Sequence, residues 1–178
     1  EIEALSERYK AFLEEAKQLQ GKDSLGLLNH FSHAALTMTA PESFKSQSKA
    51  FIARVASGEA EKIEIKGARS PGKVRVLLVT TPEGDGVIPF VQTAEGWKID
   101  EVGPAFGDFS KEVNLKGNMP ATPPSVLASL VVLKNPQASE YDRVLAAIEL
   151  AGSKDQKMAE EFAAGEKKPW AKTALLYA

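Results

Sequence analysis

The sequence predicts an α+β fold, in which three helices pack on a four-stranded antiparallel sheet and a small all-α C-terminal segment of three to four short helices follows. Three observations carry this prediction. Up to Gly58, apolar residues recur at the three- and four-residue spacing of amphipathic helices. From Gly58 to Val102, apolar and β-branched residues form short runs that end at turn residues. Beyond a stretch rich in glycine and proline, the helical spacing returns.

Three helices are expected in the first third of the chain. The first spans residues 2–19, and Gly21 just beyond it is the residue that stops it. The second starts at Asp23 or Ser24, either of which can cap it. Its inward-facing apolar residues are Leu27, Leu28, Phe31, Ala35 and Met38. The third starts at Pro41, where the missing N–H costs little. Its buried stripe consists of Phe44, Ser48, Phe51, Ile52 and Val55.

Four strands are expected at residues 62–66, 74–81, 87–93 and 97–102. Short Gly- and Pro-containing turns join them, and such short connections imply antiparallel hairpins. Pro89 lies within the third strand. Because proline has no N–H to donate to a neighbouring strand, we expect it at a sheet edge or a bulge.

The two central strands are apolar on both faces. Val76 and Leu78 point to one face, yet Leu77 and Val79 on the other face are apolar too. A sheet covered on one side alternates apolar and polar residues, so both faces of this sheet need cover. The three helices can cover one face. The outer face is expected to meet a second copy of the chain in a homodimer, or the chain's own residues 125–178.

The chain divides at a change in composition. Residues 1–102 form the α+β domain, and residues 103–124 hold three glycines and four prolines with little periodicity, which is typical of a joint. Phe106 and Phe109 indicate that this joint packs on something. Residues 125–178 form the helical segment.

Short helices are expected throughout the C-terminal segment. One spans residues 126–134, one is capped by Ser139, one starts at Ser153 and a last short one starts at Pro169. The second of these carries a stripe that we expect to face inward, formed by Tyr141, Val144, Leu145 and Ile148.

Composition excludes several classes of function. A formal net charge of −2 gives no electrostatic reason to expect nucleic acid, whose binding usually needs a basic face. The chain has no cysteine, which excludes disulfides, thiolate catalysis and cysteine-ligated metals. The longest apolar run, Val126–Leu133, is far shorter than the roughly 20 residues that span a bilayer. We therefore expect no nucleic-acid partner and no membrane span.

Three helices followed by four strands, the last of which lies in Glu95–Val102 (EGWKIDEV), resemble the nuclear-transport-factor-two-like superfamily. The resemblance covers residues 1–102 and is closest to uncharacterised bacterial secreted or lipid-anchored members. It implies a cone-shaped fold in which a curved sheet wraps a long helix. The chain begins with Glu1 rather than Met, so we expect a processed product with a signal or anchor upstream and an extracytoplasmic location, periplasmic, secreted or lipid-anchored.

The superfamily contains enzymes such as ketosteroid isomerase and scytalone dehydratase as well as non-catalytic binding modules. An enzyme of this kind would place acid–base residues in the mouth of the cone, and the candidates here are Glu101, Tyr9 and His33. Glu101 shares a strand face with Trp97, whereas Asp100 is expected to face outward. A ligand pocket would be lined by Trp97, Phe31, Phe90 and Tyr9.

Metal and cofactor sites are not expected. His30 and His33 lie three apart on the second predicted helix, but no third ligand accompanies them, and we interpret them as partly exposed or core-edge histidines. No nucleophile elbow, phosphate loop or dinucleotide fingerprint is present.

Three hypotheses of function follow. The first is a non-enzymatic binding or association module for a small apolar ligand or a protein partner. The second is a cofactor-free isomerase- or dehydratase-type enzyme with an acid–base pocket. The third is a scaffold whose helical tail docks a larger assembly.

Overall fold

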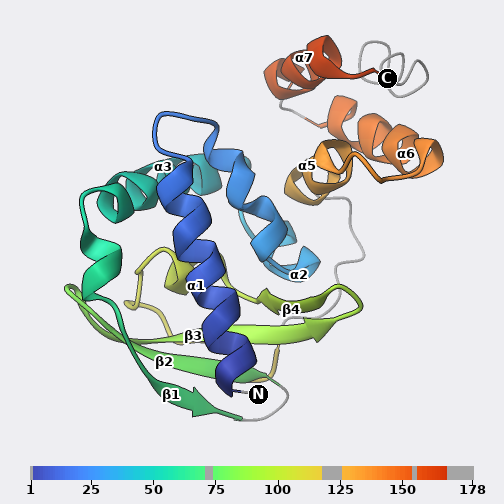
Figure 1. Ribbon diagram of the computed structural model, residues 1–178. Helices are drawn as coiled ribbons and strands as arrows, with labels where there is room; N and C mark the ends of the chain where they lie inside the picture. Colours follow the sequence, from blue (N-terminus) through green and yellow to red (C-terminus); the bar gives the residue numbers. More distant parts are fainter. Residues whose placement is uncertain (1, 71–73, 118–125, 154–155, 168–178) are drawn as a thin grey trace. The chain divides into compact units, whose positions relative to one another are not determined.

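A computed structural model of the chain describes residues 2–70, 74–117, 126–153 and 156–167. The predicted α+β class is confirmed: helices precede and follow a four-stranded antiparallel sheet (Figure 1). The chain forms two compact units, Glu1–Pro120 and Ala121–Ala178. Each unit is described by itself below.

The helices of the first unit are α1 (Ile2–Gln18), η1 (Ser24–His30), α2 (His33–Thr37), α3 (Pro41–Ala56) and η2 (Glu59–Lys62), where η denotes a 3₁₀-helix. In α3 the predicted stripe is the buried one, and in α1 the buried residues also follow one face, although Ile2 at its start is 53% exposed. The buried residues of α1 are Leu5, Tyr9, Phe12 and Ala16, and those of α3 are Phe44, Ser48, Phe51, Ile52 and Val55. The first and third helices were thus predicted correctly.

The prediction of one continuous second helix is wrong. Asp23 caps η1 as expected, but Phe31 and Ser32 are extended and separate η1 from α2. Phe31 forms a parallel bridge with Ile99 at the end of the sheet, and the Ser32 N–H donates to the Ile99 carbonyl at 2.8 Å. This backbone partner interrupts the helix. Met38, which we expected to face inward, is 75% exposed.

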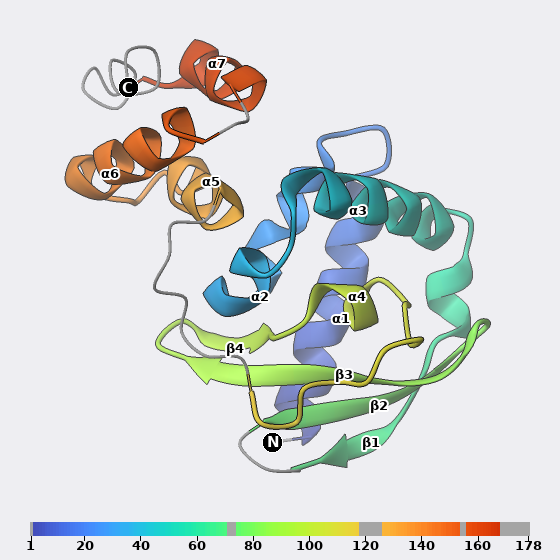
Figure 2. The same cartoon turned by 180° about the vertical axis from the view of Figure 1, so that it is seen from behind.

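The sheet has the order β1-β2-β3-β4, formed by β1 (Glu64–Arg69), β2 (Arg75–Thr81), β3 (Gly84–Thr93) and β4 (Gly96–Ile99). Every neighbouring pair is antiparallel, as predicted. Pairing of Thr81 with Gly84 and of Thr93 with Gly96 leaves only two residues in each of the last two hairpin loops. The helix α1 lies across one face of the sheet (Figures 1 and 2).

Pro89 lies in β3, an interior strand, and not at a sheet edge or bulge as expected. It stands opposite Val76 of β2, while its carbonyl accepts the N–H of Asp100 at 2.8 Å. In an antiparallel pair the N–H and C=O of one residue point to the same neighbour, so the missing N–H of Pro89 faces the end of β4. Because β4 ends at Ile99, no ladder bond is lost there.

Five phenylalanine rings fill the space between the helices and the sheet. Phe106 lies within 5.3–6.0 Å, centroid to centroid, of the rings of Phe12, Phe31, Phe44 and Phe51. It directly follows α4 (Val102–Ala105), a short helix that begins where the predicted joint was placed. The first part of residues 103–124 is therefore core of the first unit, while residues 118–124 lie outside the described residues.

The chain beyond α4 continues along the sheet (Figure 2). A Cβ added to Gly86 would collide with the ring of Phe109, and one added to Gly117 would lie 3.3 Å from Val74. Val74 and Val76 are buried, as are Leu77 and Val79, so the sheet buries apolar residues on both faces as predicted. Gly86 stands opposite Val79, so Phe109 packs on the face of Val79, whereas Gly117 approaches Val74 and covers part of the opposite, outer face. A homodimer through this face, or cover by residues 125–178, stays a prediction.

The second unit contains α5 (Val126–Lys134), α6 (Glu140–Ala151) and α7 (Gln156–Gly165). Ser139 caps α6 as predicted, and its Oγ accepts the Asp142 N–H at 3.1 Å. The helix expected from Pro169 lies outside the described residues. None of the helices in the described part of the chain is long and apolar enough to cross a membrane.

The stripe of α6 does not face inward as expected. Tyr141, Leu145 and Ile148 are 71%, 44% and 48% exposed, whereas the fully buried residues of α6 are Ala146, Ala147 and Leu150. Small residues allow α6 to approach the almost wholly apolar α5 closely. The Arg143 guanidinium, on the same side as this alanine face, pairs with Glu166 just after α7. These partners turn the larger apolar side chains outward.

Candidate functional site

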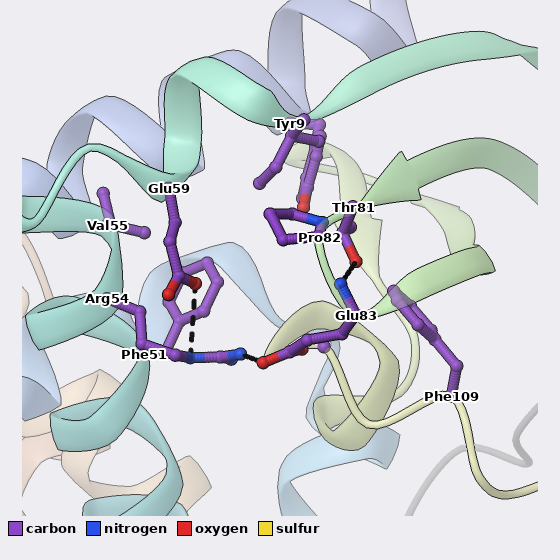
Figure 3. A pocket seen from close by; sticks show the side chains of 11 residues that line it. Tyr9, Phe51, Arg54, Val55, Glu59, Thr81, Pro82, Glu83 and Phe109 are labelled. Carbon is purple, nitrogen blue, oxygen red and sulfur yellow. Dashed lines mark hydrogen bonds and ion pairs between the residues drawn. The ribbon is translucent and has the colours of Figure 1, made fainter.

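The interior of the first unit contains one pocket that bears on the predicted chemistry, which we call the Tyr9 pocket (Figure 3). It lies between α1, α3 and the β2–β3 hairpin. Its lining includes Tyr9, Phe51, Arg54, Thr81, Glu83 and Phe109. The volume is about 20 Å³, which is room for one water molecule. Pockets that bind small molecules usually have volumes of about 300–1,000 Å³.

Tyr9 is the one predicted site residue in this pocket. It is 2% exposed, and its hydroxyl points toward the β2–β3 hairpin (Figure 3). Burial raises the pKa of this hydroxyl, although the positive charge of Arg54 opposes the shift. Within the described part of the chain no hydrogen bond to the hydroxyl is found and no basic side chain accepts its proton. Tyr9 is therefore a neutral phenol at physiological pH.

Arg54 closes one side of the Tyr9 pocket. Its guanidinium pairs with Glu83 in the β2–β3 hairpin and, at 3.9 Å, with Glu59 of η2. It also donates to the carbonyl of Phe106 at 2.5 Å. These contacts tie α3, the hairpin and the end of α4 together. The arginine is thus engaged by protein groups on three sides, which is typical of a structural clamp.

Glu101 lies away from Tyr9. It lines an open groove of about 450 Å³ between the α2–α3 connection and residues 100–114. Its carboxylate accepts the N–H of Asn114 at 2.6 Å. Burial, and less strongly the charge of Asp100, raise its pKa, while the Asn114 N–H opposes the shift.

Asp100 does not face outward as we expected. It is 2% exposed and accepts a hydrogen bond from the Ser32 hydroxyl at 2.7 Å. Ser32 reaches it because the extended residues before α2 run beside the end of β4. The carboxylate therefore holds the α2 start against the sheet.

The two histidines are also placed differently from the prediction. His33 is exposed at the start of α2, but His30 is buried, and it lies in η1 rather than on one continuous helix with His33. The Nε2 atom of His30 lies 2.6 Å from Glu15 Oε2. Burial lowers the pKa of His30, although the hydrogen bond to Glu15 opposes the shift. In the part of the chain that the structure describes, no group of three or more metal-ligating side chains occurs.

The predicted ligand-pocket residues do not surround a common cavity. Phe31 and Phe90 are buried in the filled core, and only Tyr9 lines the small pocket. Trp97 is half-buried, and its backbone carbonyl accepts the Arg8 Nε–H at 3.0 Å. The acid–base candidates Glu101, Tyr9 and His33 are likewise distributed over separate places.

The feature that sequence reasoning missed is the outward face of α6, which we call the α6 stripe and define as Tyr141, Leu145 and Ile148. Its spacing was visible in the sequence. The stripe faces outward because the opposite face of the same helix, where Ala146 and Ala147 permit close packing, is the one that faces inward. Comparisons of the chain with protein-family models, curated proteins and solved structures found no match.

Proposed function

We propose that the chain is a non-enzymatic association module that docks a protein partner through the α6 stripe. One observation carries this proposal: three large apolar side chains at i, i+4 and i+7 of α6 are 44–71% exposed. Residues at this spacing form one face of a helix, and such faces bind apolar grooves or other helices. Docking would remove these side chains from water.

The interior of the first unit supports a protein partner more than a small apolar ligand. The Tyr9 pocket accommodates one water molecule, and five phenylalanine rings fill the core between the helices and the sheet. The separation of Glu101, Tyr9 and His33 gives an isomerase- or dehydratase-type mechanism no assembled acid–base pair. The resemblance to the nuclear-transport-factor-two-like superfamily and the extracytoplasmic location stay predictions, and the proposal depends on neither.

Site-specific photo-crosslinking tests the proposal. A benzophenone amino acid replaces Tyr141 in the full chain, and the chain is irradiated in the cells that produce it. We expect a discrete crosslinked protein, identified by mass spectrometry, that disappears when Leu145→Ser and Ile148→Ser are added. These positions are exposed, so the double substitution should leave the circular dichroism spectrum unchanged.

Met38 provides the matched control, because it is 75% exposed and lies on the first unit, outside the α6 stripe. The same photo-crosslinker at Met38 should not capture the partner. Equal capture at Met38 and Tyr141, or capture that persists after the double substitution, would contradict docking through the α6 stripe. A crosslink from Tyr141 only to the first unit of the same chain would show that the stripe serves as internal cover.

A further inference from the structure

The charges beside the α6 stripe are unbalanced. Asp142 and Glu149 are both exposed and lie seven residues apart, so they border the same side of the stripe about 10 Å from each other along the helix. The positive charge of α6 is directed elsewhere, because Arg143 is paired with Glu166. On the opposite border lie Val144 and Ala151, which are half-buried and carry no charge.

We infer that the partner presents a basic amphipathic helix, with apolar residues on the α6 stripe and Lys or Arg side chains facing Asp142 and Glu149. This inference rests on the proposed docking function of α6. A partner of this kind would gain apolar burial from the stripe and opposite charge along one border. Like charge at that border would instead be repelled, so the two carboxylates contribute selectivity.

A second copy of the chain fits the stripe less well. If two α6 helices packed antiparallel about a two-fold axis, Asp142 and Glu149 of both copies would lie on the same side of the interface. Four carboxylates would then face one another. A stable homodimer also buries about 1,200 Å² or more, and three exposed side chains form a small patch by comparison. A short helical segment matches the size and charge of the stripe better.

Two synthetic helical peptides test the inference with the full chain. Both carry the same leucine face, and one has lysines beside it where the other has glutamates. Binding is measured by fluorescence anisotropy at low ionic strength. An exposed ion pair changes affinity by up to about fivefold, so two pairs should favour the lysine peptide by about threefold or more.

Charge reversal supplies the decisive comparison. A double variant that carries Asp142→Lys and Glu149→Lys should lose or invert the preference for the lysine peptide. Glu160→Lys with Glu161→Lys makes the same change in net charge at exposed positions of α7 and should leave the preference intact. All four positions are exposed, but Asp142 accepts a hydrogen bond from the hydroxyl of the N-cap Ser139 at 2.6 Å and Glu149 accepts one from the hydroxyl of the buried Ser129 at 2.9 Å. The comparison therefore uses only variants whose circular dichroism spectrum and urea midpoint show that the helices are intact.

The outcomes separate this inference from the docking function itself. If both peptides bind equally and Leu145→Ser with Ile148→Ser abolishes binding, the basic partner is refuted while docking through α6 survives. If neither peptide binds, both proposals are overturned. If sedimentation equilibrium shows a dimer that the same double substitution dissociates, a second copy occupies the stripe and the basic partner is refuted.

Discussion

The packing of Phe109 on Gly86 gives a prediction that tests whether residues 106–117 belong to the folded first unit. A Cβ placed on Gly86 would lie 2.6 Å from Cγ of the Phe109 ring and closer still to Cδ1 and Cε1. Ordinary contact between such atoms begins near 3.4–4 Å. Gly86 lies in β3 and does not have a positive φ, so its backbone accepts alanine. The collision with the ring is therefore the main obstacle to Gly86→Ala.

The expected magnitude follows from two opposing effects. Replacing glycine by alanine at a compatible backbone position stabilises by about 0.4–1 kcal/mol, chiefly by restricting the unfolded chain. Forcing extra volume into a packed contact costs about 1–3 kcal/mol. We therefore expect Gly86→Ala to lower the free energy of unfolding by about 1–2 kcal/mol. In a Phe109→Ala background the collision is gone, and the same substitution should be neutral or stabilising.

Urea unfolding of the four chains in this double-mutant cycle, followed by tryptophan fluorescence, measures the coupling energy. We expect about 2 kcal/mol between positions 86 and 109. Gly103→Ala is the matched control, because it lies in α4 and an added Cβ there meets nothing closer than 3.8 Å. If Gly86→Ala is as harmless as Gly103→Ala, the ring does not pack there. A cost that persists without the Phe109 ring would assign the effect to something other than this contact.

Two further predictions concern the first unit. A fragment ending at residue 120 should keep a cooperative thermal transition and an aromatic near-UV circular dichroism signal. A fragment ending at residue 102 should lose both, because it lacks Phe106. Equal behaviour of the two fragments would refute the role of Phe106. Burial lowers the pKa of His30 below its ordinary value of 6.5, so its stabilising contribution is present above pH 6.5 and is lost as pH falls below it, by up to about 1.4 kcal/mol per pH unit. His30→Gln should reduce the change of the urea midpoint between about pH 7 and pH 5.5. A midpoint that depends on pH as steeply as in the unsubstituted chain would contradict this assignment.

The helices α1, α3 and α5 were predictable to within a residue or two at each end. Their apolar spacing, their first-turn residues and the residues that end them all lie within one local segment. The strand order was predictable for the same reason, since short turns leave antiparallel hairpins as the only connection.

The errors arise where a distant partner decides the local structure. The second helix breaks because the backbone of Ser32 bonds to Ile99, which is 67 residues further along the chain (99 minus 32). In α6 the spacing showed an apolar face, but the opposite face carries alanines that pack equally well against a neighbour. Periodicity identifies an apolar face of a helix, and it does not identify which face a neighbour will choose.

The predicted ligand pocket failed for a related reason, which also bears on function. With the domain ended at residue 102, the rings of Phe12, Phe31, Phe44 and Phe51 would surround an empty space of about one phenyl group. Phe106 occupies that space, and it comes from the stretch interpreted as a joint. Glycine and proline there provide the bend that returns the chain to the core. Once this one ring is placed inside, the interior offers little room for a ligand, and the α6 stripe becomes the stronger candidate for recognition.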